Sequence, residues 1–254
     1  MVFFQRPQEP VVTDLPRAVR ALWGLDDAAG RRGPKRTLSV QAIGAAAVEI
    51  ADAEGLAAVT MAAVAERLGT TAMSLYRYVD SRQELEVVMV DIALGPAPDL
   101  HPRRSWRREI EDWARADARH LAAHPWALDV RPGSPQVTPN LLAWTDTGMQ
   151  IMLRSGLPEQ PAASALLLVD GFARQHVLMA LQFADLEASA GWADHLRELV
   201  DPEGMPGLSQ VLAAGAFDNA EPGPDGQSFP GDEFEFGLAV VLDGIEKLAA
   251  RQPS

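Results

Sequence analysis

Apolar residues recur every three or four positions along most of the chain, which is the spacing of amphipathic α-helices. The segments with this spacing are 39–55, 60–69, 71–79, 80–95, 105–124, 136–156, 159–191 and 233–251. Residues 192–231 are instead rich in Gly, Pro and Asp, and the overlapping stretch 219–232 is typical of a flexible loop. No segment shows the strict alternation of apolar and polar residues that indicates a strand. The pattern therefore predicts an all-α fold.

The first four helical segments are short, and residues that start or stop helices lie at their ends. Gly55 and Gly69 end the first two, because glycine readily adopts the backbone conformation of a helix C-cap. Each segment begins with a side chain that can accept a hydrogen bond from a helix amide, namely Ser39, Thr60, Thr70 or Thr71, and Asp80 or Ser81. Short capped helices joined by glycine turns are the layout of a helix-turn-helix, whose second helix lies in the DNA major groove.

The stretch LGTTAMSLYRYVDSRQEL, residues 68–85, contains the only two tyrosines of the chain and suits that second helix. Leu75 and Val79 are four residues apart, so we expect them to form a buried stripe. The same helical projection leaves five residues largely outside, with Tyr76 at the edge: Ala72, Met73, Ser74, Arg77 and Tyr78. Small Ala72 allows close approach to DNA, and Met73 could contact a thymine methyl group. The alternative is that both tyrosines are core aromatics with their hydroxyls at the surface.

Charge is distributed unevenly along the chain. The protein has 254 residues and a formal net charge of −13, which by itself argues against binding to phosphates. Residues 31–82, however, carry 7 basic and 5 acidic side chains, whereas residues 83–254 carry 12 basic and 26 acidic ones. The basic part includes Arg32, Lys35 and Arg36, and we interpret residues 1–37 as a flexible basic arm in which residues 16–25 allow a short helix. This arm is either a solvated linker or a tail that contacts DNA phosphates or a minor groove.

The residue types exclude or fail to support several classes of chemistry. The chain has no cysteine, which excludes disulfides and cysteine-ligated metals and is typical of a reducing cytoplasm. No uncharged apolar stretch approaches the roughly 20 residues of a membrane span, so we expect no membrane partner. The motifs of phosphate loops, nucleophile elbows and compact metal sites do not occur, although His120 and His124 are four residues apart. We therefore expect no catalytic residue, no metal, no cofactor and no enzyme activity.

The order of motifs in residues 38–95 resembles the N-terminal DNA-binding domain of TetR-family transcriptional repressors. The matching motifs are A-EG at the end of the first helix, VTM--VA--LG in the second, and SLYRYV-S--EL across the third and the start of the fourth. AAHPWAL at 122–128 and FEFGLAVVLDGIEKL at 234–248 resemble the C-terminal domain of the tetracycline-repressor-like branch. The resemblance implies a three-helix helix-turn-helix domain at 38–95 and a larger helical effector-binding and dimerisation domain at 96–254.

The resemblance also implies roles for single residues of the helix-turn-helix. Those placed near DNA phosphates are Thr60, Thr71, Tyr76 and Arg82, and those placed near bases are Ala72, Met73, Ser74 and Tyr78. Arg77 stands where an aromatic residue is common, so its role at a base or a phosphate stays open. In tetracycline repressors an arginine early in the second helix reads a base, and Ala62 stands at that position here. We therefore expect an operator that differs from theirs.

The implied function is that of a ligand-responsive repressor. A homodimer, formed through the helices 159–191 and 233–251, would bind a palindromic operator on double-stranded DNA and leave it when a small-molecule effector binds. Six residues could line the effector cavity: Trp113, His120, Trp144, Phe172, His176 and Phe183. For each of them the more common role is structural, as a core aromatic or as a hydrogen-bonded or exposed histidine. Two alternatives are a helical sensor or enzyme-like domain with a vestigial helix-turn-helix, and a protein-interaction module.

Overall fold

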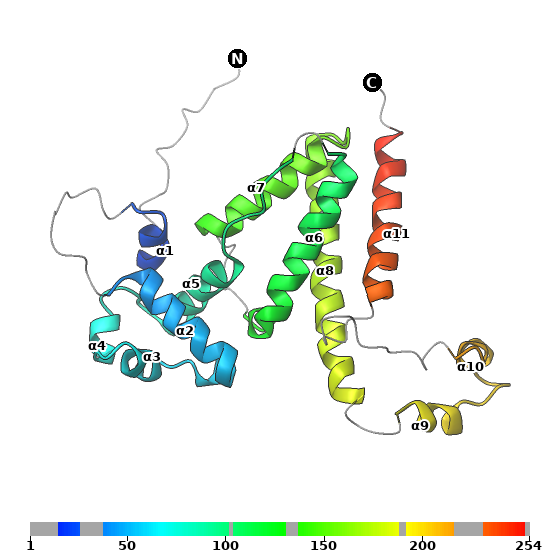
Figure 1. Cartoon of the computed structure of the whole chain (residues 1–254), viewed down its shortest axis with the longest axis horizontal. Helices are drawn as coiled ribbons and strands as arrows, with labels where there is room; N and C mark the ends of the chain where they lie inside the picture. Colours follow the sequence, from blue (N-terminus) through cyan, green and yellow to red (C-terminus); the bar gives the residue numbers. More distant parts are fainter. Residues whose placement is uncertain are drawn as a thin grey trace, which may run out of the picture. The chain divides into compact units, whose positions relative to one another are not determined.

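The computed structural model describes residues 15–25, 38–101, 104–130, 137–187, 192–215 and 231–251 of the chain. These residues form helices joined by turns, without a strand among them, which confirms the all-α fold (Figure 1). They belong to two compact units, each built from two stretches of chain: Met1–His101 with Arg119–Gln150, and Pro102–Ala118 with Ile151–Ser254. The helix-turn-helix lies in the first unit.

The first unit is built around the packing of α2 (Val40–Glu54) against α5 (Arg82–Leu94). α3 (Met61–Arg67) and α4 (Ala72–Leu75) complete the helix-turn-helix, and the short 3-10 helix η2 (Leu56–Ala58) joins α2 to α3. The largest side chains of this core are fully inaccessible to solvent, among them Ile43, Leu75, Val79, Leu85 and Met89. Burial of one such side chain contributes about 1.5–3 kcal/mol, so the core rather than helix propensity holds these short helices in place.

Three of the predicted N-caps are confirmed. The hydroxyls of Ser39, Thr60 and Ser81 each accept a hydrogen bond of 3.1 Å from the backbone amide three residues later, at the starts of α2, α3 and α5. Gly55 and Gly69 follow α2 and α3 with φ of 84° and 63°, in a region that glycine adopts without strain. Local residue chemistry therefore sets where these helices begin and end.

Within residues 1–37, which were interpreted as a flexible arm, the helix that the sequence allows around 16–25 is present. Residues Arg17–Leu22 form the helix α1, which packs against α2 and α5. Its Ala18 and Val19 are buried there, and the apolar surface that they remove from water favours an ordered helix over a solvated chain. Arg32, Lys35 and Arg36 lie outside the described residues, so their part in DNA binding stays a prediction.

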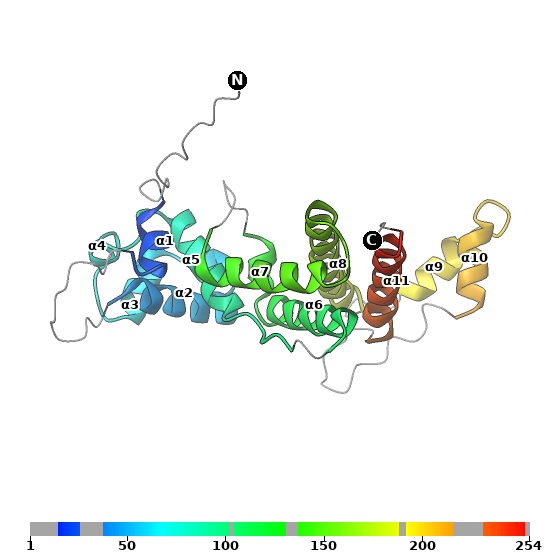
Figure 2. The same cartoon turned by 90° about the horizontal axis from the view of Figure 1, so that it is seen from above.

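Long helices dominate the second unit. α8 (Glu159–Glu187) packs along α11 (Gly231–Ala249), and the two lie side by side in both views (Figures 1 and 2). α6 (Trp106–Ala123) and α7 (Pro139–Leu153) each contribute residues to both units. Two helices that the pattern did not predict, α9 (Trp192–Leu199) and α10 (Pro206–Ala213), lie within the segment 192–231. Each has only 8 residues, too few for a helical period to stand out among the surrounding glycines and prolines.

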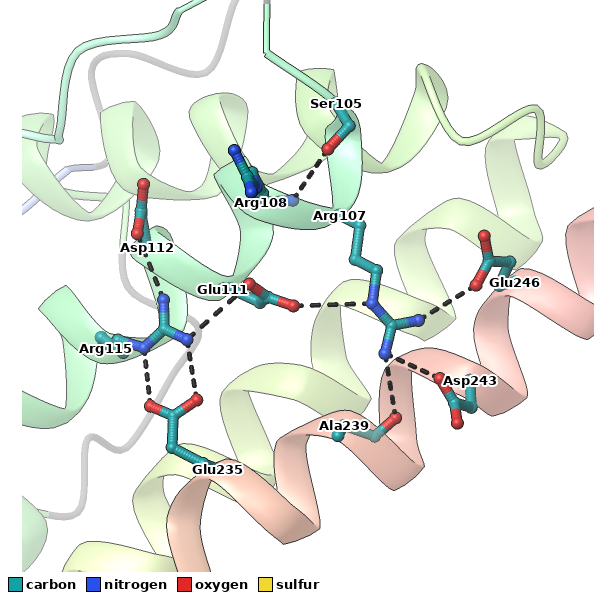
Figure 3. A network of polar contacts seen from close by, with 10 residues as sticks. All are labelled: Ser105, Arg107, Arg108, Glu111, Asp112, Arg115, Glu235, Ala239, Asp243 and Glu246. Carbon is teal, nitrogen blue, oxygen red and sulfur yellow. Dashed lines mark hydrogen bonds and ion pairs between the residues drawn. The ribbon is translucent and has the colours of Figure 1, made fainter. Parts of the chain in front are cut away.

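Charged side chains join α6 to α11 within the second unit (Figure 3). Arg115 binds both carboxylate oxygens of Glu235, each at 2.7 Å, and Arg107 donates to Asp243 at 2.7 Å and to Glu246 at 3.0 Å. The hydrogen bonds from Arg115 hold the pKa of the Glu235 carboxyl below its usual value. Water and salt screen these partly exposed pairs, so their main effect is to set the register of α6 on α11.

Among the residues that the structure describes, one helical segment is long and apolar enough to cross a membrane, namely Glu159–Gln182 of α8. Only 28% of that window is buried within the chain, and it contains the charged residues Asp170 and Arg174. The same composition is expected of a core helix that packs on α11 with one face and on a further helical partner with another.

Gly44 of α2 tests the packing of α2 on α5. A Cβ at this position would lie 2.3 Å from Cδ1 of Ile92 and 2.6 Å from Cγ1 of Val88, and the branched Val88 side chain is stiff and fully buried. We expect Gly44→Ala to lower the free energy of unfolding by about 1–3 kcal/mol, although alanine is the better helix former. Urea unfolding followed by circular dichroism measures the change.

The matched control for this substitution is Ala45→Gly, at the exposed neighbouring position of α2. It should cost about 1 kcal/mol through helix propensity alone. If Gly44→Ala instead stabilised the protein by that amount, α2 and α5 would not be in the close contact described.

Candidate DNA-binding surface and effector site

The recognition segment, residues 71–79, has a buried and an exposed face. Leu75 and Val79 are 0% exposed, which confirms the predicted inner stripe. On the opposite face Met73 is 76% exposed, and Arg77 is exposed as well. A methionine that is this exposed does not contribute to the core. Met73 is suited to contact a base edge, and the nearby Arg77 is suited to contact a phosphate.

The two tyrosines differ from the prediction, which placed Tyr78 outside and Tyr76 at the edge. Tyr76 is 46% exposed, whereas Tyr78 is half-buried and packs against the hydrophobic core. The reason is that α4 ends at Leu75, so the projection of a continuous helix does not apply beyond it. The amide of Tyr78 donates to the carbonyl of Leu75 at 2.8 Å in a tighter turn, which directs the Tyr78 ring inward.

Small residues and hydroxyls surround the starts of α3 and α4. Thr71 immediately precedes α4, but its side chain caps no backbone amide. Instead its Oγ1 lies 2.9 Å from Oγ of Ser74, at hydrogen-bond distance. Thr60 and Thr71 are exposed, while Ala72 and Ser74 are half-buried. Because a hydroxyl can donate and accept at once, Thr60 can cap α3 and still donate to a phosphate oxygen.

Arg82, which was expected near a phosphate, also has partners within the protein. Its Nε donates to Glu86 at 2.9 Å, and its Nη2 donates to the carbonyl of Leu56 at 3.0 Å. These bonds link the start of α5 to η2. A guanidinium has five N–H donors, so a phosphate contact would not require either bond to break.

Two of the six predicted effector residues, His120 and Trp144, contact each other in the first unit. Their ring centroids are 5.3 Å apart in an edge-to-face arrangement. The Trp144 indole donates to the carbonyl of Gly95 at 3.1 Å, which ties α7 to the residue that follows α5. Burial, together with repulsion from His124, lowers the pKa of His120 and favours its neutral form.

Two more of the six, Phe172 and His176, lie together on α8 in the second unit and face Phe234 of α11. The centroid of Phe234 is 5.4 Å from that of Phe172 and 5.1 Å from that of His176. The helices approach closely because residue 237 is glycine, where a Cβ would lie 2.5 Å from the Phe172 ring. Burial lowers the pKa of His176 as well. We call Phe172, His176 and Phe234 the aromatic cluster; Phe234 is not among the residues predicted to line the effector cavity.

The remaining two predicted effector residues are not placed in a site. Trp113 is buried in the second unit, at 4% exposure. The side chain of Phe183 lies outside the described residues, although its backbone belongs to α8.

Sequence reasoning missed a buried carboxyl on α6. Asp117 is 5% exposed, and its Oδ2 has no hydrogen-bond partner among the described residues. Burial raises its pKa to about 7; the Asp170 carboxyl adds to the shift, and the Arg174 guanidinium opposes it. A signal was present, because Asp117 follows Trp113 and Ala114 by four and three residues and so interrupts the apolar stripe of α6.

Two protein-family models match the chain. The model for bacterial regulatory proteins of the tetR family matches residues 43–86. The model for the tetracyclin repressor-like C-terminal domain matches residues 97–249, which is more than half of the chain. The chain belongs to the TetR family. Proteins of this family are generally non-enzymatic transcription factors.

Relatives of this TetR-family protein include two named repressors. It is 34% identical over 247 residues to the HTH-type transcriptional repressor DrrR1 of Streptomyces coeruleorubidus, a match that covers 94% of this chain and 88% of DrrR1. It is 28% identical over 211 residues to the class A tetracycline repressor from transposon 1721 of Escherichia coli, covering 80% and 88%. The protein is therefore a TetR-family transcriptional repressor with a helix-turn-helix DNA-binding domain and a ligand-binding C-terminal domain.

Solved structures show the same fold. ActR of Streptomyces coelicolor in complex with actinorhodin has a TM-score of 0.69 and 25% identity, covering 84% of this chain and 96% of that one. ActR in complex with (S)-DNPA has a TM-score of 0.67 and the same identity, covering 84% and 98%. These two structures are ligand complexes of a TetR-family protein with the same helical arrangement.

The raised pKa of Asp117 predicts how stability depends on pH. Because the folded-state pKa of about 7 lies above the ordinary value of 3.8, the folded state holds a proton that the unfolded chain has lost. This contribution to stability is complete below about pH 4 and disappears as the pH rises toward 7. Between pH 5 and pH 8, ionisation of Asp117 should lower the free energy of unfolding of the wild type by roughly 2–3 kcal/mol. The variant Asp117→Asn should not show this decrease.

Urea unfolding of the wild type and of the variant at pH 5 and pH 8 measures the decrease in each protein. All other titrating groups are shared, so their contribution cancels when the two decreases are subtracted. Asp129→Asn, at an exposed position, is the matched control and should leave the pH dependence unchanged. Parallel pH curves for the wild type and Asp117→Asn would contradict the assignment.

Proposed function

We propose that this protein binds a palindromic operator as a homodimer and leaves it when a small-molecule effector binds. The observation that carries the proposal is the exposed face of the recognition segment, with Met73 and Tyr76 in water above a fully buried stripe. In a helix-turn-helix, side chains presented in this way reach base edges and phosphates in the major groove. We assign residues 38–95 to this task and residues 96–254 to effector binding and dimerisation.

The individual contacts that we propose are those that the resemblance to TetR-family repressors implies. The proposed phosphate contacts are Thr60, Thr71, Tyr76 and Arg82, and the proposed base contacts are Ala72, Met73, Ser74 and Tyr78. Tyr78 would use its hydroxyl alone, since its ring packs on the core. Arg77 is exposed and long enough to serve either role.

The homodimer is proposed to form through α8 and α11. Both helices hold large apolar side chains in water, namely Leu167, Leu168, Leu178 and Met179 on α8 and Phe236, Val240 and Leu248 on α11. Leu167 and Phe236 are 71% and 73% exposed. Several large exposed apolar side chains on two packed helices are typical of an interaction site, and a second copy of the same two helices would complete a four-helix interface.

Effector binding is proposed for the helical domain matched by the C-terminal family model. The aromatic cluster offers rings against which an aromatic effector could pack. Asp117 offers a carboxyl that can donate or accept a hydrogen bond according to its protonation. Release from DNA then requires only that the effector bind one dimer geometry more tightly than the other. Regulators of this family are generally cytoplasmic, and we propose the same for this protein.

Selection of a duplex from a random-sequence library by the purified protein tests the DNA-binding proposal. We expect a palindromic consensus, because a two-fold dimer presents two identical recognition segments about 34–36 Å apart. Arg77→Ala and Tyr76→Phe should each weaken binding to the selected duplex by about tenfold, measured by fluorescence anisotropy at fixed salt concentration.

Lys247→Ala, which removes one exposed positive charge from the last turn of α11, is the control and should bind like the wild type. If the selection enriched no sequence, the proposal that this protein binds an operator would be refuted. Unchanged affinity in both recognition-segment variants would move the DNA contact elsewhere.

Substitutions on the exposed apolar face test the dimer. Leu167→Glu and Phe236→Glu place a charge where the interface would bury it, so each should convert a dimer into a monomer in sedimentation velocity. Val211→Glu replaces an exposed apolar residue of α10 that lies outside this face, and it should leave the dimer intact. A wild type that sediments as a monomer at micromolar concentration would refute this interface.

A further inference from the structure

The helix α1 precedes the residues that the tetR-family model matches, which begin at 43. It has 6 residues, too few to be stable alone, yet it is ordered against the helix-turn-helix. It makes contacts at three places: the end of the recognition segment, the start of α5, and Val137, two residues before α7.

The first contact is made at the end of the recognition helix. Arg17 Nη1 donates to the carbonyl of Arg77 at 3.2 Å and reaches that of Tyr76 at 3.5 Å. The same nitrogen lies 3.4 Å from Asp80. Carbonyls at the end of a helix lack partners within it, so one guanidinium here satisfies two backbone groups and also complements the helix dipole.

The second contact is a buried carboxylate. Glu84 of α5 is 7% exposed, and its Oε1 accepts a hydrogen bond of 2.7 Å from the amide of Ala18. Its other oxygen accepts from the amide of Asp80. A buried charge is stable only when such bonds are made, so Glu84 holds α1 and the turn before α5 in one arrangement.

The third contact is made at the other end of α1. The indole of Trp23 donates to the carbonyl of Val137 at 2.7 Å, two residues before α7 begins. Between the two ends, Ala18 and Val19 are buried at 0% and 3% exposure. α1 is therefore anchored along its whole length.

Two backbone hydrogen bonds at the end of α4 are long, whereas those from the amides of Ser74 and Tyr78 are of ordinary length, at 2.9 and 2.8 Å. α4 has 4 residues, and the bonds from the amides of Tyr76 and Arg77 back to the helix are both 3.4 Å. Bonds of that length lie beyond the usual range for N–H···O contacts and are weak. The backbone that presents these two side chains thus depends on partners outside α4.

We propose that α1 is a positioning element of the DNA-binding unit, which holds the backbone of Tyr76 and Arg77 so that their side chains meet the operator in a fixed orientation. The inference rests on the proposed function in that it takes DNA as the ligand. Arg17 acts on the protein backbone in this role. The competing role is that Arg17, whose side chain is half exposed, binds a phosphate itself.

Two variants separate these roles. Arg17→Ala removes the contact with the two carbonyls, and Trp23→Phe removes the bond to Val137 without changing any charge. For a duplex selected by the wild type from a random-sequence library, we expect Arg17→Ala to weaken binding about tenfold and Trp23→Phe by a smaller factor. Affinity for an unselected duplex of the same length should not change, and neither should the slope of log affinity against log salt. Arg119→Ala, an exposed arginine of the same unit, is the control for lost charge.

Amide hydrogen exchange gives a reading that does not depend on DNA. In Arg17→Ala the amides of Tyr76, Arg77 and Tyr78 should exchange at least about fivefold faster, while those at the centre of α2 keep their protection. Unchanged exchange together with unchanged affinity for the selected duplex would overturn the proposal. Unchanged exchange with a salt slope reduced by about one would assign Arg17 to a phosphate instead. If the wild type selects no duplex, the proposed function fails, and the exchange experiment still decides whether α1 holds the recognition segment.

Discussion

Burial of Leu75 and Val79 under the α2–α5 core is the interaction on which the DNA-binding unit depends. A helix of 4 residues does not form by itself in water, because nucleation fixes several dihedral angles for one hydrogen bond. The recognition segment exists because these two side chains, both 0% exposed, are held in an already formed apolar layer. Everything that the segment offers to a ligand, from Met73 to Arg77, is oriented by that layer and by the contacts around its edge.

Carboxylates accept several of the hydrogen bonds that join the elements of the first unit, so part of the acidic charge has a structural role. In the first unit Glu84 binds α1, Asp91 accepts a bond of 2.8 Å from an amide in the first turn of α7, and Asp52 accepts one of 2.7 Å from the Trp126 indole in η3 (Pro125–Leu128). In each case an N–H donor satisfies the oxygen, so burial does not leave it unpaired. Asp117 of the second unit differs, since one of its oxygens has no such partner in the described part of the chain.

Most helices of the first unit could be predicted because their ends are decided locally. A hydroxyl at position 39, 60 or 81 and a glycine at 55 or 69 act on the nearest few amides and carbonyls, so the residues alone specify them. The two tyrosines were misplaced because helical projection assumes that the helix continues, and α4 stops at Leu75. The aromatic cluster joins α8 to α11 across about sixty residues of sequence, a contact that no periodicity within one helix reports.

The residues alone specify the all-α class, the helix-turn-helix with its caps, and the likeness to TetR-family repressors. These depend on short-range spacing: 3.6-residue periodicity, side chain to amide distances, and motifs in a fixed order. Only the tertiary structure decided that α1 is part of the DNA-binding unit, that Tyr76 rather than Tyr78 is offered to solvent, and that Asp117 lies buried. Those outcomes depend on which surfaces meet when distant segments pack, because burial and hydrogen-bond satisfaction belong to the folded contact and not to any one residue.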